Sequence, residues 1–244
     1  MSPTIPDAIL RVQGMHYRWP GQARDCLLID DFAVQRGETV FLHGPSGSGK
    51  STLLSLLAGV FLPQQGRVCL DGRDWASLGA AARDRYRADR LGYIFQQFNL
   101  LPYLSVRDNV LLPCRFSAAR AQAAAASQGS AQAAAEHWLR AMDLPAASWD
   151  APARALSVGQ QQRVAAARAL VGAPPVVIAD EPTSALDENR RDAFMDLLLA
   201  ACAQADSTLV FVSHDQRLAP RFARQVDLAQ INRAASAATA ASMA

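Results

Sequence analysis

A glycine-rich stretch of the chain could bind phosphate. Residues 44–51 match the pattern G-x-x-x-x-G-K-S/T at every required position. Glycines let successive backbone N–H groups face a polyphosphate, and a helix that follows adds its unpaired amides. Lys50 would bring a positive charge to the β- and γ-phosphates, and the Ser51 hydroxyl could ligate Mg²⁺. The motif alone does not separate kinases, GTPases and ATPases. The residues expected to contact nucleotide here are Gly44, Pro45, Ser46, Gly47, Ser48, Gly49, Lys50, Ser51 and Thr52.

Two acidic residues follow an apolar run at residues 176–179. Asp180 is predicted to hold a magnesium ion at the end of a strand, and Glu181 to orient or deprotonate an attacking water. Pro182 cannot extend a strand ladder and would direct the chain out of the sheet. Taken alone, the pair could equally be solvated acids in a loop. The phosphate-binding motif elsewhere in the chain favours the functional interpretation.

A third motif lies at residues 156–163, Leu-Ser-Val-Gly-Gln-Gln-Gln-Arg. Ser157 and Gln160 fit a capping box, so the simplest interpretation is the start of a helix that continues through residues 164–170. A capped helix N-terminus that contains glycine is also an anion site. The two interpretations are compatible.

Three apolar runs, at residues 39–42, 176–179 and 208–212, should position these motifs. None alternates, as expected for strands buried on both faces, and the helix-like segments between them favour a parallel sheet. Because ligands bind at the carboxyl ends of such strands, we expect the polar residues after each run to face one crevice. Residues 98–156 read as helical without a convincing strand. Their alanine-rich part, residues 117–135, is predicted to be a mobile helix pair or loop that buries little.

The bulk properties of the sequence favour a globular α/β protein and give no support to several other classes. With 244 residues, 50% of them hydrophobic, the chain can form one α/β domain with an added arm, or two small domains. Its net charge of +2 gives no reason to propose nucleic-acid binding. The four cysteines form no C-x-x-C pair, so we expect buried, reduced thiols. No secretory signal or membrane-spanning stretch is apparent, so any membrane role should come through a partner.

Taken together, these motifs resemble those of the ABC ATPases. Residues 156–160 resemble the family's signature sequence, usually L-S-G-G-Q, with Val158 at the position of the first glycine. Gln96 matches the Q-loop glutamine, with Gln97 the weaker alternative. Residues 184–187 resemble the D-loop, which ends at Asp187, and His214 resembles the switch histidine. The resemblance covers about residues 10 to 232.

The resemblance implies an α/β P-loop NTPase fold: a mainly parallel core sheet, an N-terminal antiparallel β subdomain and an inserted α-helical subdomain. The expected divisions are residues 1–96 and 157–233 for the two parts of the ATP-binding core, residues 97–156 for the helical subdomain, and residues 234–244 for a disordered tail.

The implied function is that of the ATP-binding and ATP-hydrolysing subunit of an ABC transporter, with ATP and Mg²⁺ bound. Two copies would close head to tail around two ATP molecules. The implied catalytic residues are Lys50, Glu181 and His214, and the implied metal ligands are Ser51, Gln96 and Asp180. Besides residues 44–52, the nucleotide contacts would be Trp19 (or Tyr17) stacking on adenine, together with Gln96, Ser157, Gly159, Gln160 and Asp187.

The segment at residues 98–110 resembles the region after the Q-loop in lipoprotein-release and macrolide-export ATPases. In those, an apolar groove receives a short helix of the membrane permease, and Phe98, Leu100, Leu101 and Tyr103 would line it here unless they serve ordinary packing. The chain would then lie on the cytoplasmic face of the inner membrane, bound to its permease.

Three other interpretations stay open. A soluble ABC protein acting on nucleic acid or ribosomes usually carries tandem ATPase domains or long coiled coils, which are lacking here. A P-loop kinase would not need the signature and D-loop motifs. Val158 leaves room for a weakly active or regulatory ATPase.

Overall fold

The computed structural model describes residues 8–234. The chain divides into two compact units, the first made of Met1–Asp84 with Val210–Ala244 and the second of Arg85–Leu209. The tail expected at residues 234–244 falls outside the described residues except for Ala234. The boundaries expected at residues 96/97 and 156/157 stay predictions.

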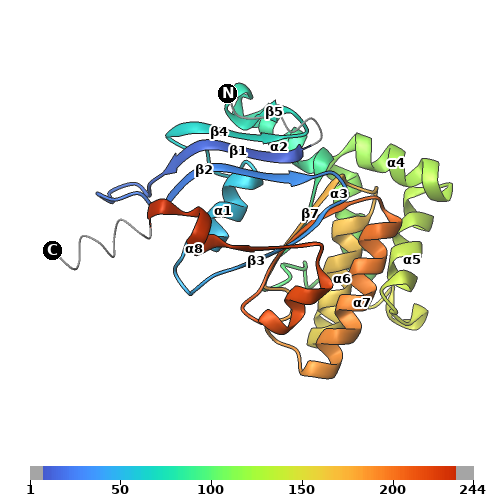
Figure 1. Cartoon of the computed structure of the whole chain (residues 1–244). Coiled ribbons are helices and arrows are strands. Elements are labelled where there is room, and N and C mark those ends of the chain that lie inside the picture. Colours follow the sequence, from blue (N-terminus) through green and yellow to red (C-terminus); the bar gives the residue numbers. More distant parts are fainter. Residues whose placement is uncertain (1–7, 235–244) are drawn as a thin grey trace. The chain divides into compact units, whose positions relative to one another are not determined.

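The first unit contains an antiparallel sheet with the strand order β2-β1-β4-β5 (Figure 1). Leu10, Val12 and Met15 of β1 are buried and lie opposite Val34, Phe32 and Ile29 of β2. The expected N-terminal antiparallel subdomain is therefore confirmed. Its strands are β1 (Ala8–Tyr17), β2 (Leu27–Gln35), β4 (Gln65–Leu70) and β5 (Arg73–Asp74).

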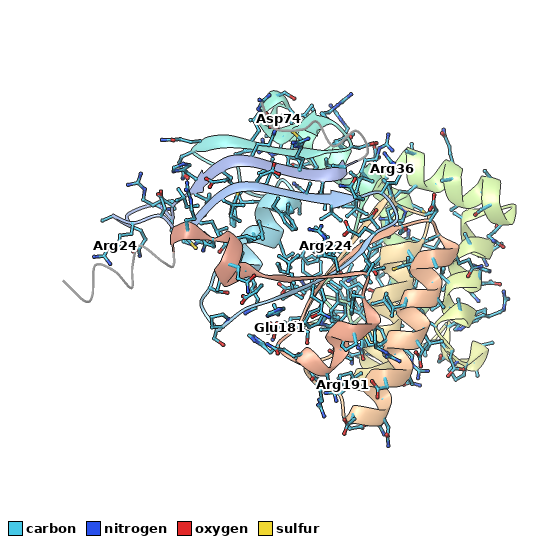
Figure 2. All side chains as sticks on the ribbon, viewed as in Figure 1. Arg24, Arg36, Asp74, Glu181, Arg191 and Arg224 are labelled. Atoms are coloured by element: carbon cyan, nitrogen blue, oxygen red, sulfur yellow. The ribbon has the colours of Figure 1, made fainter. Side chains whose placement is uncertain are left out.

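A second part of the first unit carries the glycine-rich segment. Strand β3 (Thr39–His43) pairs in parallel with β9 (Arg224–Asp227), and helix α1 (Lys50–Leu57) follows the glycines. Arg224, labelled in Figure 2, donates to Glu38 over 2.6 Å and thereby ties β9 to the turn before β3. Short helices complete the unit: η1 (Trp75–Ser77), η4 (Gln216–Arg221) and α8 (Leu228–Ile231).

The second unit contains the parallel pair β6 (Leu91–Ile94) and β7 (Val176–Asp180). Helices α5, α6 and α7 run beside one another in this unit (Figure 1), and α4 contacts α5. Its helices are α3 (Val106–Phe116), α4 (Ala118–Gln128), α5 (Ala131–Ala141), η2 (Ala146–Ser148), η3 (Ala153–Ala155), α6 (Val158–Leu170) and α7 (Glu188–Gln204). Helix α2 (Ala80–Arg90) and strand β8 (Thr208–Val212) each continue from one unit into the other. The strands predicted at residues 39–42, 176–179 and 208–212 are all confirmed.

The alanine-rich segment is a helix pair, not a loop. Ser117 and Ser130 cap the N-termini of α4 and α5, and Gly129 ends α4 in the left-handed conformation. The expectation that the segment buries little was wrong at Arg120, which is 3% exposed. Its guanidinium donates to backbone carbonyls of Leu91, Ala169 and Val171, and so fastens α4 to the end of α6 and the start of β6. Burial lowers the pKa of Arg120 to about 10, so it remains charged at neutral pH.

The four cysteines are free thiols, as expected. The expectation that they are buried holds for Cys202 and was wrong for Cys26, Cys69 and Cys114, which are half-buried. In the part of the chain that the structure describes, no helix is both long and apolar enough to cross a membrane.

Candidate functional site

The glycine-rich segment forms a loop between β3 and α1. Gly49 is the N-cap of α1 with φ of 98°, and a Cβ there would come within 2.8 Å of the Leu27 side chain, so only glycine fits. No side chain caps α1, which leaves its first amides available to an anion. The Ser48 hydroxyl is buried and has no hydrogen-bond partner among the described residues. Backbone amides and an unpartnered hydroxyl at one helix tip suit a phosphate group.

Lys50 lies inside this loop. Its side chain is 7% exposed, and Nζ donates to the carbonyls of Gly44 over 2.9 Å and Pro45 over 3.0 Å. It is the only lysine in the chain, so every other member of the 24 Lys and Arg residues is arginine. An ammonium is compact and presents its donors in several directions, whereas a guanidinium is a broad planar fork. The loop therefore holds the one basic group whose shape fits between its carbonyls.

Asn232 braces the loop from the other end of the chain and was missed by sequence reasoning. It is 2% exposed, accepts from Leu28 N over 2.9 Å and donates to Cys26 O over 3.0 Å and Ser48 O over 3.4 Å. No local motif marks it, because its partners lie about 200 residues earlier in the chain.

The aromatic candidates near the N-terminus form one cluster with Phe61, which the sequence analysis had not included. Ring centroids of Trp19 and Phe61 lie 5.1 Å apart, and those of Tyr17 and Trp19 5.4 Å. Tyr17 is 5% exposed, whereas Trp19 is 39% exposed. Desolvation, and next the charge of Cys26, raise the pKa of Tyr17. Of the two candidates, Trp19 has the ring surface that an adenine could reach.

Two of the three strand ends meet in the first unit. Past β3 and β8, the residues His43, Gly44, Pro45 and His214 line a hollow of about 240 Å³ together with Gln216 and Asp227. His214 is exposed at its rim. The predicted meeting of strand ends is thus confirmed for these two; the end of β7 belongs to the other unit.

The two acids stand at the end of β7 in the second unit, where Figure 2 labels Glu181. Asp180 is half-buried as the last residue of the strand, and Glu181 has φ of 46°, a left-handed conformation that is uncommon for a non-glycine residue. Burial, and next the Asp180 carboxylate, raise the pKa of Tyr93 on the neighbouring strand β6. The backbone therefore leaves the extended conformation directly after Asp180.

The turn after β6 holds Gln96 and Gln97, both exposed. Directly after them, Phe98 and Asn99 have φ of 58° and 48°. Arg168 of α6 fastens this turn by donating to the carbonyls of Asn99 over 2.7 Å and of Phe98. Burial lowers the pKa of Arg168 to about 10, so the guanidinium stays charged at neutral pH. The glutamine turn and the helix of the third motif are thereby one connected piece, which sequence reasoning missed.

The third motif forms the N-terminus of α6, as predicted. Ser157 and Gln160 make the full capping box: Ser157 N donates to the Gln160 side chain over 2.9 Å, and Gln160 N to Ser157 Oγ over 3.4 Å. Val158 is 49% exposed, and a Cβ on Gly159 would meet only the Leu186 side chain, at 3.9 Å. Behind this tip is a hollow of about 270 Å³, here named the signature hollow, lined by Ser157, Gly159, Gln160, Gln162, Arg163, Leu186, Arg190 and Phe194.

Asp187 closes the loop that follows Glu181. Its carboxylate accepts from Arg190 N over 3.0 Å, caps α7 and pairs with the Arg190 guanidinium over 3.2 Å. Its partners in this structure are thus on its own helix.

No cluster of three or more His, Cys, Asp or Glu side chains suited to a metal occurs within residues 8–234. The predicted metal ligands are of another kind: the Ser51 hydroxyl, the Gln96 amide and the Asp180 carboxylate are all oxygen donors, the type that Mg²⁺ prefers.

Comparison with known proteins agrees with this set of motifs. Residues 29–184 match the family described as ABC transporter. The chain is 42% identical over 191 residues to the uncharacterized ABC transporter ATP-binding protein YbbA of Escherichia coli (strain K12), which covers 78% of this chain and 80% of that protein. It is 43% identical over 198 residues to the lipoprotein-releasing system ATP-binding protein LolD of Anaeromyxobacter dehalogenans (strain 2CP-C), covering 81% of this chain and 80% of that protein.

A solved dimer of the ATP-binding cassette MJ0796, in a post-hydrolysis state bound to ADP and Pi, is also similar. It aligns with a TM-score of 0.76 and 32% identity over 89% of this chain and 93% of that chain. The fold expected from the sequence is the fold of these cassettes. The chain belongs to the ABC transporter family, as an ATP-binding and ATP-hydrolysing subunit.

Proposed function

We propose that two copies of this chain close head to tail around two ATP molecules, and that this cycle drives an integral membrane permease engaged in export or lipoprotein release. The tip of α6 carries the proposal. Ser157 and Val158 lie exposed there, next to an uncrowded Gly159, at the N-terminus of a 13-residue helix. Such a tip is an anion site open to a neighbouring molecule. Each nucleotide would lie on residues 44–52 of one copy and against Ser157, Gly159 and Gln160 of the other.

Within this arrangement each predicted residue has a chemical task. Lys50 pairs with the β- and γ-phosphates, His214 contacts the γ-phosphate, and Trp19 stacks on adenine. Gln96 reaches the same phosphate region, and Asp187 contacts the facing copy. Glu181 orients a water and accepts its proton as the water attacks the γ-phosphorus. The bond to the bridging oxygen of ADP then breaks and phosphate leaves.

Ser51, Asp180 and Gln96 would hold Mg²⁺, and their oxygen donors fit it. When bound, the ion would neutralise charge that develops on the phosphates. Closure of the two copies excludes water from the phosphates and strengthens every electrostatic contact to them. Once phosphate has left, the anion that joined the two copies is gone, and the dimer loosens. The permease partner would respond to this change.

An apolar surface in the second unit supports a membrane partner. Tyr103 is 69% exposed and Phe95 40%, and Leu100 and Leu101 are half-buried. The expectation that Phe98 lines this surface was wrong, because Phe98 is buried. The permease would dock on this side, which gives the chain its place at the cytoplasmic face of the inner membrane. The similarity to LolD, named for a lipoprotein-releasing system, favours a permease of that type.

The variant Glu181→Gln tests the catalytic part of the proposal. It keeps the size of the side chain but cannot accept the proton, so it should bind ATP normally and lose about a hundredfold or more of turnover. Size-exclusion chromatography with Mg²⁺ and ATP should then show a stable dimer. A variant that hydrolyses at the wild-type rate, or stays monomeric with ATP, contradicts the proposal.

Affinity capture from detergent extracts tests the membrane partner. Recovery of the chain with ribosomes or DNA, and with no permease, contradicts this part of the proposal.

A further inference from the structure

One buried polar side chain of the signature helix has no hydrogen bond. Gln162 is fully buried, and neither its Oε1 nor its Nε2 has a partner among the residues that the structure describes. The two glutamines before it in the helix both have hydrogen bonds. Gln160 closes the capping box, and Gln161 donates to Leu156 O over 3.0 Å. A buried amide without hydrogen-bond partners destabilises the conformation in which it occurs. A second conformation in which the Gln162 amide forms hydrogen bonds would therefore be stabilised by them.

The surroundings of Gln162 indicate where that partner lies. Gln162 lines the signature hollow together with Leu186 of the loop at residues 184–187 and Phe194 of α7. The charged groups of the hollow already have partners: Arg163 donates to Asp143 over 2.9 Å, and Arg190 pairs with Asp187. Among the residues that line the hollow, Leu186 belongs to the loop between β7 and α7, whose backbone lies outside helix and strand.

That loop contains two long backbone hydrogen bonds. Between Glu181, with its φ of 46°, and the cap of α7 its backbone makes two long hydrogen bonds, from Ser184 N to Glu181 O over 3.3 Å and from Leu186 N to Thr183 O over 3.2 Å. Both are near the upper limit for an N–H···O bond, and exchanging either for a bond to Gln162 costs little. The amide offers both a donor and an acceptor, which matches a peptide group.

We infer that Gln162 is a positioning residue of the ATPase cycle: its amide hydrogen-bonds the backbone of residues 184–187 when two copies close on ATP, and fixes the signature tip relative to that loop. This inference rests on the proposed head-to-tail dimer. It predicts that the Gln162 side chain lowers the folding stability of the chain without nucleotide and stabilises the closed dimer. A side chain that served only core packing would stabilise the folded chain in both states.

The variant Gln162→Met tests this, because methionine has a similar length and no amide. Without nucleotide, its melting temperature should rise by about 2 to 4 °C, since the unpartnered amide is gone. Combined with Glu181→Gln, it should require about five- to tenfold more ATP for half-maximal dimer formation, the loss of one hydrogen bond per site. ATP binding to the isolated chain, measured at concentrations too low for dimers, should not change.

Gln161→Met is the matched control on the same helix. It removes the bond to Leu156 O and should lower the melting temperature, with the ATP dependence of dimer formation changed by less than about twofold. Two outcomes overturn the inference. A lower melting temperature in Gln162→Met would mean that the amide already has hydrogen bonds in the chain without nucleotide. Dimer formation of the double variant at the same ATP concentration as Glu181→Gln alone would mean that the amide does not contribute to closure. Gln162→Leu repeats the test, and failure of both variants to fold also overturns it.

Glu181→Gln alone separates the two proposals. If that variant never dimerises with ATP, the head-to-tail dimer itself fails and the role of Gln162 fails with it. If it dimerises, its difference from the double variant tests Gln162 only.

Discussion

The phosphate loop and the signature helix bind parts of the same nucleotide in the proposed dimer, but they are built differently. In the loop, Lys50 finds its partners five and six residues away, at Pro45 and Gly44. The signature helix is capped locally at Ser157 and Gln160, yet its other end depends on distant contacts. Arg168 reaches back about 70 residues to the turn at Phe98, and Arg120 holds the last carbonyls of α6 from about 50 residues away. The lysine of the loop is thus held within its own segment, although Asn232 braces that segment from afar through Ser48 O. The end of the signature helix is held by arginine side chains whose partners are distant in sequence.

The largest expected effect comes from the locally built site. Lys50→Ala should weaken ATP binding by more than about a hundredfold, because the phosphates lose their charge-assisted partner. Lys50→Arg keeps the charge, and should still lose about tenfold or more, because a guanidinium does not fit between the carbonyls of Gly44 and Pro45. Titration with a fluorescent ATP analogue measures both.

The single lysine provides an independent check. An amine-directed reagent should modify only Lys50 and the chain's terminal amine, and ATP should protect Lys50. Two results would contradict the assignment of the loop as the phosphate site: an unchanged affinity of Lys50→Ala for ATP, or a rate of Lys50 modification that ATP does not lower.

A smaller effect is expected for Arg168 and Arg120, the arginines that bond to carbonyls distant in sequence. Their loss should lower folding stability and leave ATP affinity unchanged. Arg168→Met should lower the free energy of unfolding by about 3 kcal/mol, because the carbonyls of Phe98 and Asn99 lose a buried charged donor. Arg120→Met should do the same for the end of α6. Arg115→Met is the control: Arg115 makes an exposed pair with Asp108, worth less than about 1 kcal/mol. Denaturant unfolding measures the free energy of unfolding of all three variants. Equal decreases would mean that the buried arginines contribute no more to stability than the exposed ion pair of Arg115.

The smallest effect is expected at the signature position that departs from the family pattern. Val158 is 49% exposed, and the capping box forms without its side chain. Val158→Gly should therefore change steady-state ATP hydrolysis by less than about threefold and cost a few tenths of a kcal/mol in helix stability. A gain of tenfold or more would mean that the natural chain is an impaired or regulatory ATPase, and that the open space at Gly159 is not sufficient for the tip to bind phosphate.

The features predicted correctly from sequence share one property: the residues that define them are close together in the chain. Strands at residues 39–42, 176–179 and 208–212, the glycine loop before α1 and the Ser157–Gln160 capping box each depend on steric and hydrogen-bonding rules that act over a few residues. Family membership followed because such short motifs occur in a fixed order.

Tertiary structure alone decided the supporting contacts. Asn232 under the phosphate loop, Phe61 beside Trp19 and Arg120 in the alanine-rich helices have no pattern of their own, because their partners come from remote segments. The alanine-rich segment shows the reason. Its composition correctly indicated helix, but whether one arginine in it is solvated or buried against carbonyls depends on what packs over it, and no local rule contains that information. The unpartnered amide of Gln162 is likewise visible only after the helix is packed.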